Sequence, residues 1–299
     1  ELTSKTENIT NQWQSFIKKD KRIQSCSVIY TKHNHSNSKK DMDSQNEQVS
    51  NKFDLSHLGK IIFVASGKGG VGKSTISSNI AASIAEMGFK VGLMDADVYG
   101  PSQPKMLGID KSKIEILNRK IYPKEIGNLS MMSMGMLFPE HEAIIWRGPM
   151  LMKAIQQLLL DVAWGHQDYF IVDLPPGTGD IHITLAQKVL ISGAIVISTP
   201  QDISLIDAKK AIALFNKTNT KILGLIENMS YFECPNCGEK HDIFSNGGVE
   251  KITKSEKLPY LGSIPLIKEI MECADNGKPY ALQNEEGKEL FSEIVKNIF

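Results

Sequence analysis

The sequence has no excess of charge of either sign and no long hydrophobic run. Its 299 residues include 34 Lys and Arg against 34 Asp and Glu, so the formal net charge is zero. Proteins that bind nucleic acid over a broad surface usually carry an excess of basic residues. A membrane-spanning helix needs ~20 consecutive apolar residues, and no run approaches that length. We therefore expect neither a nucleic-acid partner nor a membrane span.

Cysteine is also scarce. Four cysteines in a chain of this length cannot form the dense disulfide framework of a small secreted domain. Residues 1–19 are polar, include acidic residues and lack the apolar core of a secretory signal peptide. We therefore expect a cytoplasmic protein. In a reducing compartment a close pair such as Cys234 and Cys237 more often indicates metal binding or redox chemistry.

The composition divides the chain into three parts. Residues 1–32 predict one helix and one strand, which cannot bury a core alone. Residues 33–58 are mostly polar and bury too little to offset the entropy of ordering, so we predict a flexible linker. The main domain is expected over residues 59–299.

Continuous apolar runs alternate with segments of helical period along this main domain. Such runs are typical of strands buried on both faces. Their alternation with helices predicts an α/β fold, a mostly parallel sheet flanked by helices on both faces. The irregular stretch 108–140 contains short pieces at 120–122 and 129–132 that look like a hairpin insertion. The expected strands are 60–66, 90–94, 169–172, 193–198, 221–226 and 260–264, and the expected helices are 74–87, 149–163, 181–190, 204–215, 248–254 and 288–299.

A glycine-rich loop follows the first expected strand directly and opens a helix. It fits the phosphate-binding pattern G-x-x-x-x-G-K-[ST] in the strand–loop–helix context that the pattern requires. Its backbone N–H groups can surround phosphate oxygens, and the helix N-terminus adds the positive end of its dipole. We expect Lys73 to contact the β and γ phosphates of ATP and Ser74 Oγ to ligate Mg²⁺. The expected binding residues are Gly67, Lys68, Gly69, Gly70, Val71, Gly72, Lys73, Ser74 and Thr75.

Carboxylates end two of the expected strands, at the edge where α/β proteins bind ligands. Asp95 and Asp97 follow the strand at 90–94, and Asp173 closes the strand at 169–172. Phosphoryl transfer needs charges that hold Mg²⁺ and a group that orients the attacking water. Asp173 fits a magnesium-holding carboxylate. The loop 175–180 follows it, and the Gly177 N–H could sense the γ-phosphate.

The C-x-x-C pair of Cys234 and Cys237 supplies two thiolates, whereas an iron–sulfur cluster or a structural zinc usually has four ligands. A two-fold axis could bring two copies together around one shared [4Fe–4S] cluster. His241 and Cys273 could instead complete a zinc site within one copy. The pair could also be a redox dithiol without metal. The spacing alone leaves these three interpretations open.

Together these motifs resemble the Mrp/ApbC family of iron–sulfur cluster carriers, within the MinD/ParA-like class of P-loop NTPases. Lys68, directly after the first glycine, matches the deviant motif K-G-G-x-G-K-[ST] of that class. The likeness extends from residue 59 to about residue 298. The other segments that carry it are 95–102, 146–149, 173–180, 227–230 and the C-x-x-C.

The resemblance implies a homodimer that sandwiches ATP and hydrolyses it slowly. Lys68 would reach the partner's nucleotide, Asp97 would position the attacking water, and Asp95 would lie near the magnesium shell. Asn228 would read adenine, since an amide presents both a donor and an acceptor, and Pro265 would lie in the loop that covers the base.

For the cysteines, the resemblance implies a labile [4Fe–4S] cluster that bridges Cys234 and Cys237 of two copies. Such a cluster would be received from scaffold proteins and delivered to apo-proteins. Many bacterial members also carry a small N-terminal domain, and residues 1–32 resemble only its final part. We therefore expect residues 1–32 to be a remnant of that module.

Two other classes share the phosphate loop. A MinD/ParA-like switch would act in membrane or DNA positioning, and the apolar positions of segment 288–299 could lie on a membrane surface. A final helix packed on the sheet fits that segment better, since Glu289 and Glu293 would face anionic lipid. A reductase like the nitrogenase iron protein also bridges a cluster, but its cysteines are widely separated. The pair Cys234 and Cys237 favours the carrier.

Overall fold

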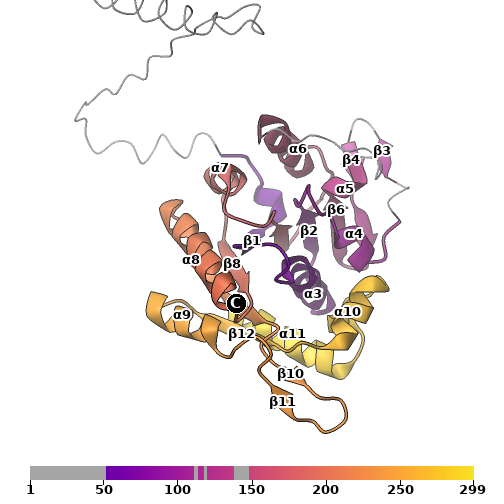
Figure 1. Cartoon of the computed structure of the whole chain (residues 1–299). Coiled ribbons are helices and arrows are strands. Elements are labelled where there is room, and N and C mark those ends of the chain that lie inside the picture. The colour runs from indigo at the N-terminus through magenta and orange to yellow at the C-terminus, as the bar shows by residue number, and fades with distance from the viewer. Residues whose placement is uncertain (1–51, 111–113, 118–119, 138–147) are drawn as a thin grey trace, which may run out of the picture. The chain divides into compact units, whose positions relative to one another are not determined.

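The computed structural model describes residues 52–110, 114–117, 120–137 and 148–299 (Figure 1). These residues belong to one compact unit, Gln48–Phe299. The predictions for residues 1–32, for most of the linker and for Trp146 and Arg147 fall outside the described residues.

An eight-stranded sheet runs through the centre of the domain (Figure 1). Its strand order is β12-β9-β8-β1-β7-β2-β6-β5, and every neighbouring pair is parallel except β5 with β6. The central strands are buried along nearly their whole length, as their apolar runs predict. The strands are β1 (Lys60–Ser66), β2 (Val91–Asp95), β5 (Lys124–Ile126), β6 (Leu129–Ser133), β7 (Tyr169–Asp173), β8 (Gly193–Ser198), β9 (Ile222–Asn228) and β12 (Tyr260–Ile264).

Helices flank this sheet, which confirms the predicted α/β architecture. Helix α3 packs against α11 and against β2 and β7, whereas α8 packs against α9 and β8. The helices are η2 (Ser56–Leu58), α3 (Lys73–Glu86), α4 (Gln103–Met106), α5 (Met134–Leu137), α6 (Gly148–Leu160), α7 (Asp180–Lys188), α8 (Asp202–Lys217), α9 (Gly248–Glu256), α10 (Lys268–Asp275), η3 (Tyr280–Leu282) and α11 (Glu285–Ile298).

Both pieces of the predicted hairpin insertion lie in antiparallel hairpins, but one of them also belongs to the main sheet. Strand β4 (Lys120–Tyr122) does pair antiparallel with β3 (Glu115–Leu117). Strand β6, however, belongs to the main sheet, where it is parallel to β2 and buried at all five positions. Its Leu-Ser-Met-Met-Ser sequence is short and only partly apolar, so its burial depends on neighbours that are distant in the sequence.

The end of the predicted linker also differs from the prediction. Leu55 and Leu58 are buried, and the N–H of Phe53 donates to the carbonyl of Lys188 at 2.9 Å. Residues 53–58 therefore pack on the domain, because the three apolar side chains among them provide the burial that the preceding polar residues cannot. The part of the linker before residue 52 lies outside the described residues.

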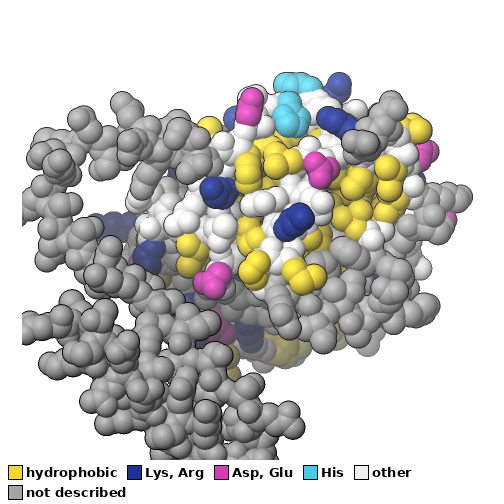
Figure 2. Space-filling view, turned by 90° about the horizontal axis from the view of Figure 1, so that it is seen from above, with side chains coloured by type: hydrophobic (Ala, Val, Ile, Leu, Met, Phe, Trp, Pro, Cys, Tyr) yellow, Lys and Arg dark blue, Asp and Glu magenta, His cyan; other side chains and the backbone are white. Residues whose placement is uncertain are grey.

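Helix α11 buries Phe291, Ile294, Val295 and Ile298. This confirms a final helix packed on the domain, against α3 and β12. Across the described ranges, no helix is both long enough and apolar enough to span a bilayer. On the face shown in Figure 2, basic, acidic and apolar side chains are interspersed, in keeping with the balanced composition.

Candidate nucleotide and cysteine sites

The glycine-rich loop occupies residues 67–72, between β1 and α3, as predicted. Gly72 has a φ of 83°, and a Cβ at this position would lie 2.2 Å from Asn228 Nδ2. Both the backbone conformation and the space therefore require glycine. Helix α3 begins at Lys73 without a side-chain cap from Gly72. The first N–H groups of α3 thus have no capping side chain and suit an anion.

Lys73 and Asp173 meet in the buried interior of the site. Lys73 Nζ donates to Asp173 Oδ1, and the two side chains are 5% and 0% exposed. Ser77 Oγ donates to the same carboxylate oxygen at 3.1 Å. Lys73 Nζ also lies 3.3 Å from Ser74 Oγ. The expected phosphate-binding lysine and two expected magnesium ligands therefore form one cluster.

Asp95 lies beside Asp173, because the parallel register of β2 and β7 pairs these two residues. Asp95 Oδ2 accepts from Ser133 Oγ at 2.9 Å, and Asp95 Oδ1 accepts from the Asp97 N–H at 3.1 Å. Burial, together with the negative charge of Asp173, raises the pKa of Asp95 to about 7. A divalent cation here would favour the ionised form, so the two carboxylates suit Mg²⁺.

Asp97 shapes the turn after β2. Its Oδ1 accepts from the backbone N–H groups of Tyr99 at 3.1 Å and Gly100 at 3.2 Å. The carboxylate is largely buried, at 8% exposed. The turn holds Asp97 two residues beyond the end of β2, near Asp95, and its role towards the attacking water stays a prediction.

Gln103, at the start of α4, belongs to this cluster and was missed by the sequence analysis. Gln103 Nε2 donates to the carbonyl of Ser74 and to Asp173 Oδ2, both at 2.9 Å. The Gln103 N–H also donates to Asp95 Oδ2 at 3.3 Å. No motif marks a lone glutamine, so only its place shortly after the Asp95–Asp97 segment could have drawn attention to it.

The loop after β7 is fixed by two hydrogen bonds. The Gly177 N–H donates to the carbonyl of Ser66 at 2.9 Å, so contact with a γ-phosphate would require this bond to open. His182, on α7, places Nε2 3.0 Å from the carbonyl of Pro175. Burial lowers the pKa of His182 to about 4, so the imidazole is neutral at pH 7.

Lys68 lies half-buried at the edge of the loop. Its Nζ donates to Gln201 Oε1 at 3.3 Å, immediately before α8. Helix α8 also approaches the loop closely, since a Cβ at Gly67 would lie 2.2 Å from the backbone of Asp207. Within this copy, the Lys68 side chain is thus directed to Gln201 beside α8. Its action across a dimer stays a prediction.

A cavity of about 310 Å³ adjoins the loop, because Gly72 and Thr75 form part of its wall. Asn228 and Pro265 also line it, so the two residues expected at the adenine lie together beside the phosphate loop. Asn228 Nδ2 donates to the carbonyl of Val71 at 2.8 Å. The remaining lining side chains are mostly apolar and include Ile264, Leu266, Ile267, Ile270 and Met271.

Cys234 and Cys237 lie at the tip of a hairpin formed by β10 (Phe232–Glu233) and β11 (Lys240–His241), which extends away from the sheet (Figure 1). The tip is closed by hydrogen bonds from the Cys234 N–H to Glu239 O at 2.9 Å and from the Gly238 N–H to Cys234 O at 2.8 Å. Cys237 is exposed and Cys234 is partly exposed.

The hairpin favours the thiolate form of Cys234. Hydrogen bonds from the backbone N–H groups of Asn236 and Cys237, and from the Cys237 thiol, lower the pKa of Cys234. Within the described part of the chain, no three His, Cys, Asp or Glu side chains are placed to hold a metal ion. A zinc site completed by His241 and Cys273 in one copy is therefore not supported by this geometry.

The foot of the hairpin is joined to the wall of the 310 Å³ cavity. The Ser230 N–H donates to Ile264 O at 3.0 Å, and the Leu266 N–H donates to Tyr231 O at 2.7 Å. Ile264 and Leu266 both line the cavity. The cysteine pair and the candidate base pocket thus share backbone hydrogen bonds.

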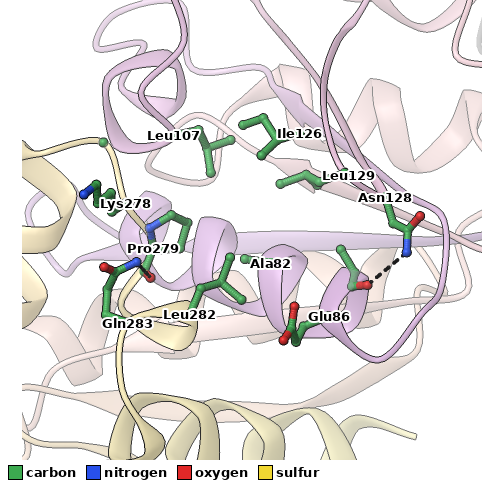
Figure 3. A pocket seen from close by; sticks show the side chains of 13 residues that line it. Ala82, Glu86, Leu107, Ile126, Asn128, Leu129, Lys278, Pro279, Leu282 and Gln283 are labelled. Atoms are coloured by element: carbon green, nitrogen blue, oxygen red, sulfur yellow. Dashed lines mark hydrogen bonds between the residues drawn. The ribbon is translucent and has the colours of Figure 1, made fainter.

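A separate cavity of about 630 Å³ lies beside the C-terminal half of α3 (Figure 3). Figure 3 shows Leu107, Ile126 and Leu129 on one side of it and Pro279 and Leu282 on another, while Asn128 Nδ2 donates to the carbonyl of Ala85. None of its lining residues belongs to the phosphate loop or to the carboxylate cluster. This cavity is therefore no part of the nucleotide site.

Comparison with known proteins agrees with this geometry. The family model described as ParA, the NUBPL iron-transfer P-loop NTPase, matches residues 57–299. The chain belongs to this family. The match begins near the start of the predicted ATPase domain and includes both the phosphate loop and the cysteine pair.

Relatives of known name support the same assignment. The iron-sulfur cluster carrier protein of Aquifex aeolicus is 46% identical over 238 residues, which cover 79% of this chain and 64% of that protein. The iron-sulfur cluster carrier protein of Deinococcus radiodurans is 50% identical over 227 residues, which cover 76% of this chain and 64% of that protein. The iron-sulfur cluster carrier protein of Escherichia coli is 43% identical over 253 residues, which cover 84% of this chain and 68% of that protein. The matched region thus spans just under two thirds of the first two relatives.

Solved structures resemble the chain in the same region. A nucleotide-binding protein from Archaeoglobus fulgidus in complex with ADP is 35% identical, with a TM-score of 0.69, over 82% of this chain and 96% of that one. The cell division ATPase MinD of Pyrococcus furiosus is 21% identical, with a TM-score of 0.58, over 80% of this chain and 98% of that one. The likeness to MinD shows a shared fold alone.

Proposed function

We propose that this protein is an ATP-hydrolysing iron–sulfur cluster carrier that works as a homodimer in the cytoplasm. The observation that carries the proposal is one chain with two sites, a phosphate loop beside buried carboxylates and an exposed Cys234–Cys237 pair on a hairpin. The name of the Aquifex and Deinococcus relatives supports the carrier function. The ADP in the Archaeoglobus structure supports nucleotide binding.

Ser74, Asp95 and Asp173 would hold Mg²⁺, and their hydroxyl and carboxylate oxygens are ligands that this ion prefers. Magnesium would neutralise charge on the phosphates during hydrolysis. Lys73 would exchange its bond to Asp173 for phosphate oxygens. Asp97 would orient the attacking water.

Lys68 would act across the homodimer, on the nucleotide of the other copy. Asn228 and Pro265 would contact the adenine in the adjoining cavity. Hydrolysis is proposed to be slow, as suits a switch that gains little from fast chemistry. The predicted remnant at residues 1–32 and the linker that follows remain part of this proposal.

The cluster would be cargo. Cys234 and Cys237 from each of two copies would supply the four thiolates of a bridging [4Fe–4S] cluster. The backbone N–H groups that lower the pKa of Cys234 would stabilise its thiolate form. Scaffold proteins would supply the cluster, and apo iron–sulfur proteins would receive it.

The test is anaerobic reconstitution with iron and sulfide, followed by absorbance near ~400 nm and an iron count. We expect about four irons per dimer in the parent, none in Cys234→Ala and the parental value in Cys273→Ala. Cys273 lies on α10, outside the hairpin, and serves as the matched control. A parent without a cluster, or a cluster indifferent to Cys234→Ala, would overturn the carrier function.

A further inference from the structure

Gln103 is a fully buried amide between the elements that carry the expected magnesium ligands. Its Nε2 donates at 2.9 Å both to the carbonyl of Ser74, on α3, and to Asp173 Oδ2, at the end of β7. Its backbone N–H donates to Asp95 at the end of β2. Gln103 therefore connects all three predicted magnesium-binding residues.

The orientation of this amide follows from its partners. The carbonyl of Ser74 can only accept, and Asp173 is a carboxylate that already accepts from Lys73, so both require a donor. The NH₂ group of Gln103 must then face them. The carbonyl oxygen, Oε1, therefore does not face either of these two acceptors.

Gln103 Oε1 is buried and has no hydrogen-bond partner among the described residues. Leaving a buried amide oxygen without a partner is unfavourable, and native proteins rarely do so. Because Oε1 belongs to the same small planar group as Nε2, it lies next to Ser74 and Asp173. A donor on a molecule bound in the magnesium region would be within reach of Oε1 and would satisfy it.

We propose that Gln103 Oε1 accepts a hydrogen bond from a water molecule bound to the magnesium ion of the nucleotide. Magnesium keeps several waters in protein sites, and such waters turn their hydrogens outward. Gln103 is then a positioning residue for the metal and not a ligand. The inference rests on the proposed Mg-ATP binding.

The experiment measures ADP affinity by calorimetry over a range of magnesium concentrations. Gln103→Met keeps the side-chain length but removes the acceptor, together with the Nε2 donor to Ser74 and Asp173. We expect Gln103→Met to raise the magnesium concentration that gives half of the maximal increase in ADP affinity by about tenfold or more. Affinity for ADP in EDTA should stay within about twofold of the parent, because the acceptor serves the metal alone.

Gln167→Met is the matched control. Gln167 is also a buried glutamine whose Nε2 donates to a backbone carbonyl, that of Trp164, and whose Oε1 has no partner. It lies outside the nucleotide site, before β7, and its loss should leave the magnesium requirement unchanged. An equal effect of the two variants would overturn the proposal.

Gln103→Glu retains an acceptor oxygen at the position of Oε1 and places the second carboxyl oxygen, which donates only when it is protonated, against Asp173 and the Ser74 carbonyl. Its magnesium requirement should stay within about threefold of the parent. A loss as large as that of Gln103→Met would make the donor bond to Asp173 the cause and would overturn the proposal. If Gln103→Met does not fold, Gln103→Asn, with a shorter reach, takes its place with the same expectation.

The outcomes also separate this inference from the function on which it rests. A magnesium-dependent parent with an unaffected Gln103→Met would overturn the inference and leave the proposed function standing. A parent whose ADP binding ignores magnesium would overturn both.

Discussion

Lys73 and Asp173 form a buried ion pair that joins the first turn of α3 to the end of β7, although they are 100 residues apart in the sequence. Ser77 donates to one oxygen of Asp173 and Gln103 to the other. Removing one partner of such a pair leaves an uncompensated charge inside the protein. Lys73 therefore contributes to folding as well as to the expected phosphate contact.

Lys73→Met should lower the free energy of unfolding by about 3–5 kcal/mol and abolish ATP hydrolysis. The double variant Lys73→Met/Asp173→Asn should recover much of that stability, because the buried charge is also removed, while hydrolysis stays absent. Urea denaturation and phosphate release measure the two properties. Normal hydrolysis in Lys73→Met would contradict the assignment of the phosphate loop.

Gly72→Ala should destabilise the protein by about 1–3 kcal/mol and weaken ADP binding. The new Cβ would meet Asn228 Nδ2, and a φ of 83° is unfavourable for alanine. Thermal unfolding and ADP calorimetry measure the two effects. Gly100→Ala is the control, since a Cβ there has no heavy atom within 4 Å, and its stability should change by less than about 0.5 kcal/mol.

His182 should make the protein less stable in mild acid. Its pKa falls from 6.5 to about 4 on folding, so the unfolded chain binds the proton more readily. The stabilising contribution is complete above pH 6.5 and is lost as the pH falls towards 4. Between pH 7 and pH 5 the loss should be about 2 kcal/mol.

His182→Gln should remove this part of the pH dependence, whereas His166→Gln, which changes an exposed histidine, should retain it. Denaturant midpoints at pH 7 and pH 5 provide the comparison. Asp95, with its raised pKa, acts in the opposite direction, but it is present in every variant and cancels. Identical pH dependence in the parent and His182→Gln would show that the imidazole is not responsible.

Lys68→Ala should reduce ATP hydrolysis by about 100-fold or more, as expected for the loss of a positive group near the transferred phosphate. Binding of ADP should change little, because Lys68 is expected to act on the nucleotide of the other copy. Lys254→Ala, at an exposed ion pair on α9, is the control. Sedimentation with a non-hydrolysable ATP analogue should show less dimer for Lys68→Ala alone.

The sequence was most informative where its signals are local. Strand β1 matches its predicted bounds, because Lys60–Ser66 is a continuous apolar run that leads directly into the glycine loop. The positions of Asp95 and Asp173 follow from the rule that parallel strands present their ends at one edge. Asn228 and Pro265 were named from the family resemblance, and they line one cavity.

Features that depend on distant neighbours could not be predicted. The sequence indicates a short strand at 129–132, but its place in the main sheet depends on pairing with the distant strand β2. Gln103 reaches Ser74 and Asp173 only after α4 packs beside α3. The burial of Leu55 and Leu58 similarly depends on surfaces that form when the rest of the domain folds.

Backbone hydrogen bonds at the foot of the cysteine hairpin connect the cysteine site to the candidate base pocket. Ile264 and Leu266 line the candidate base pocket, and their backbones are hydrogen-bonded to Ser230 and Tyr231, respectively. Tyr231 precedes Cys234 by only three residues. A displacement of this pocket wall would therefore be transmitted through two backbone hydrogen bonds to the chain that leads into the cysteine hairpin.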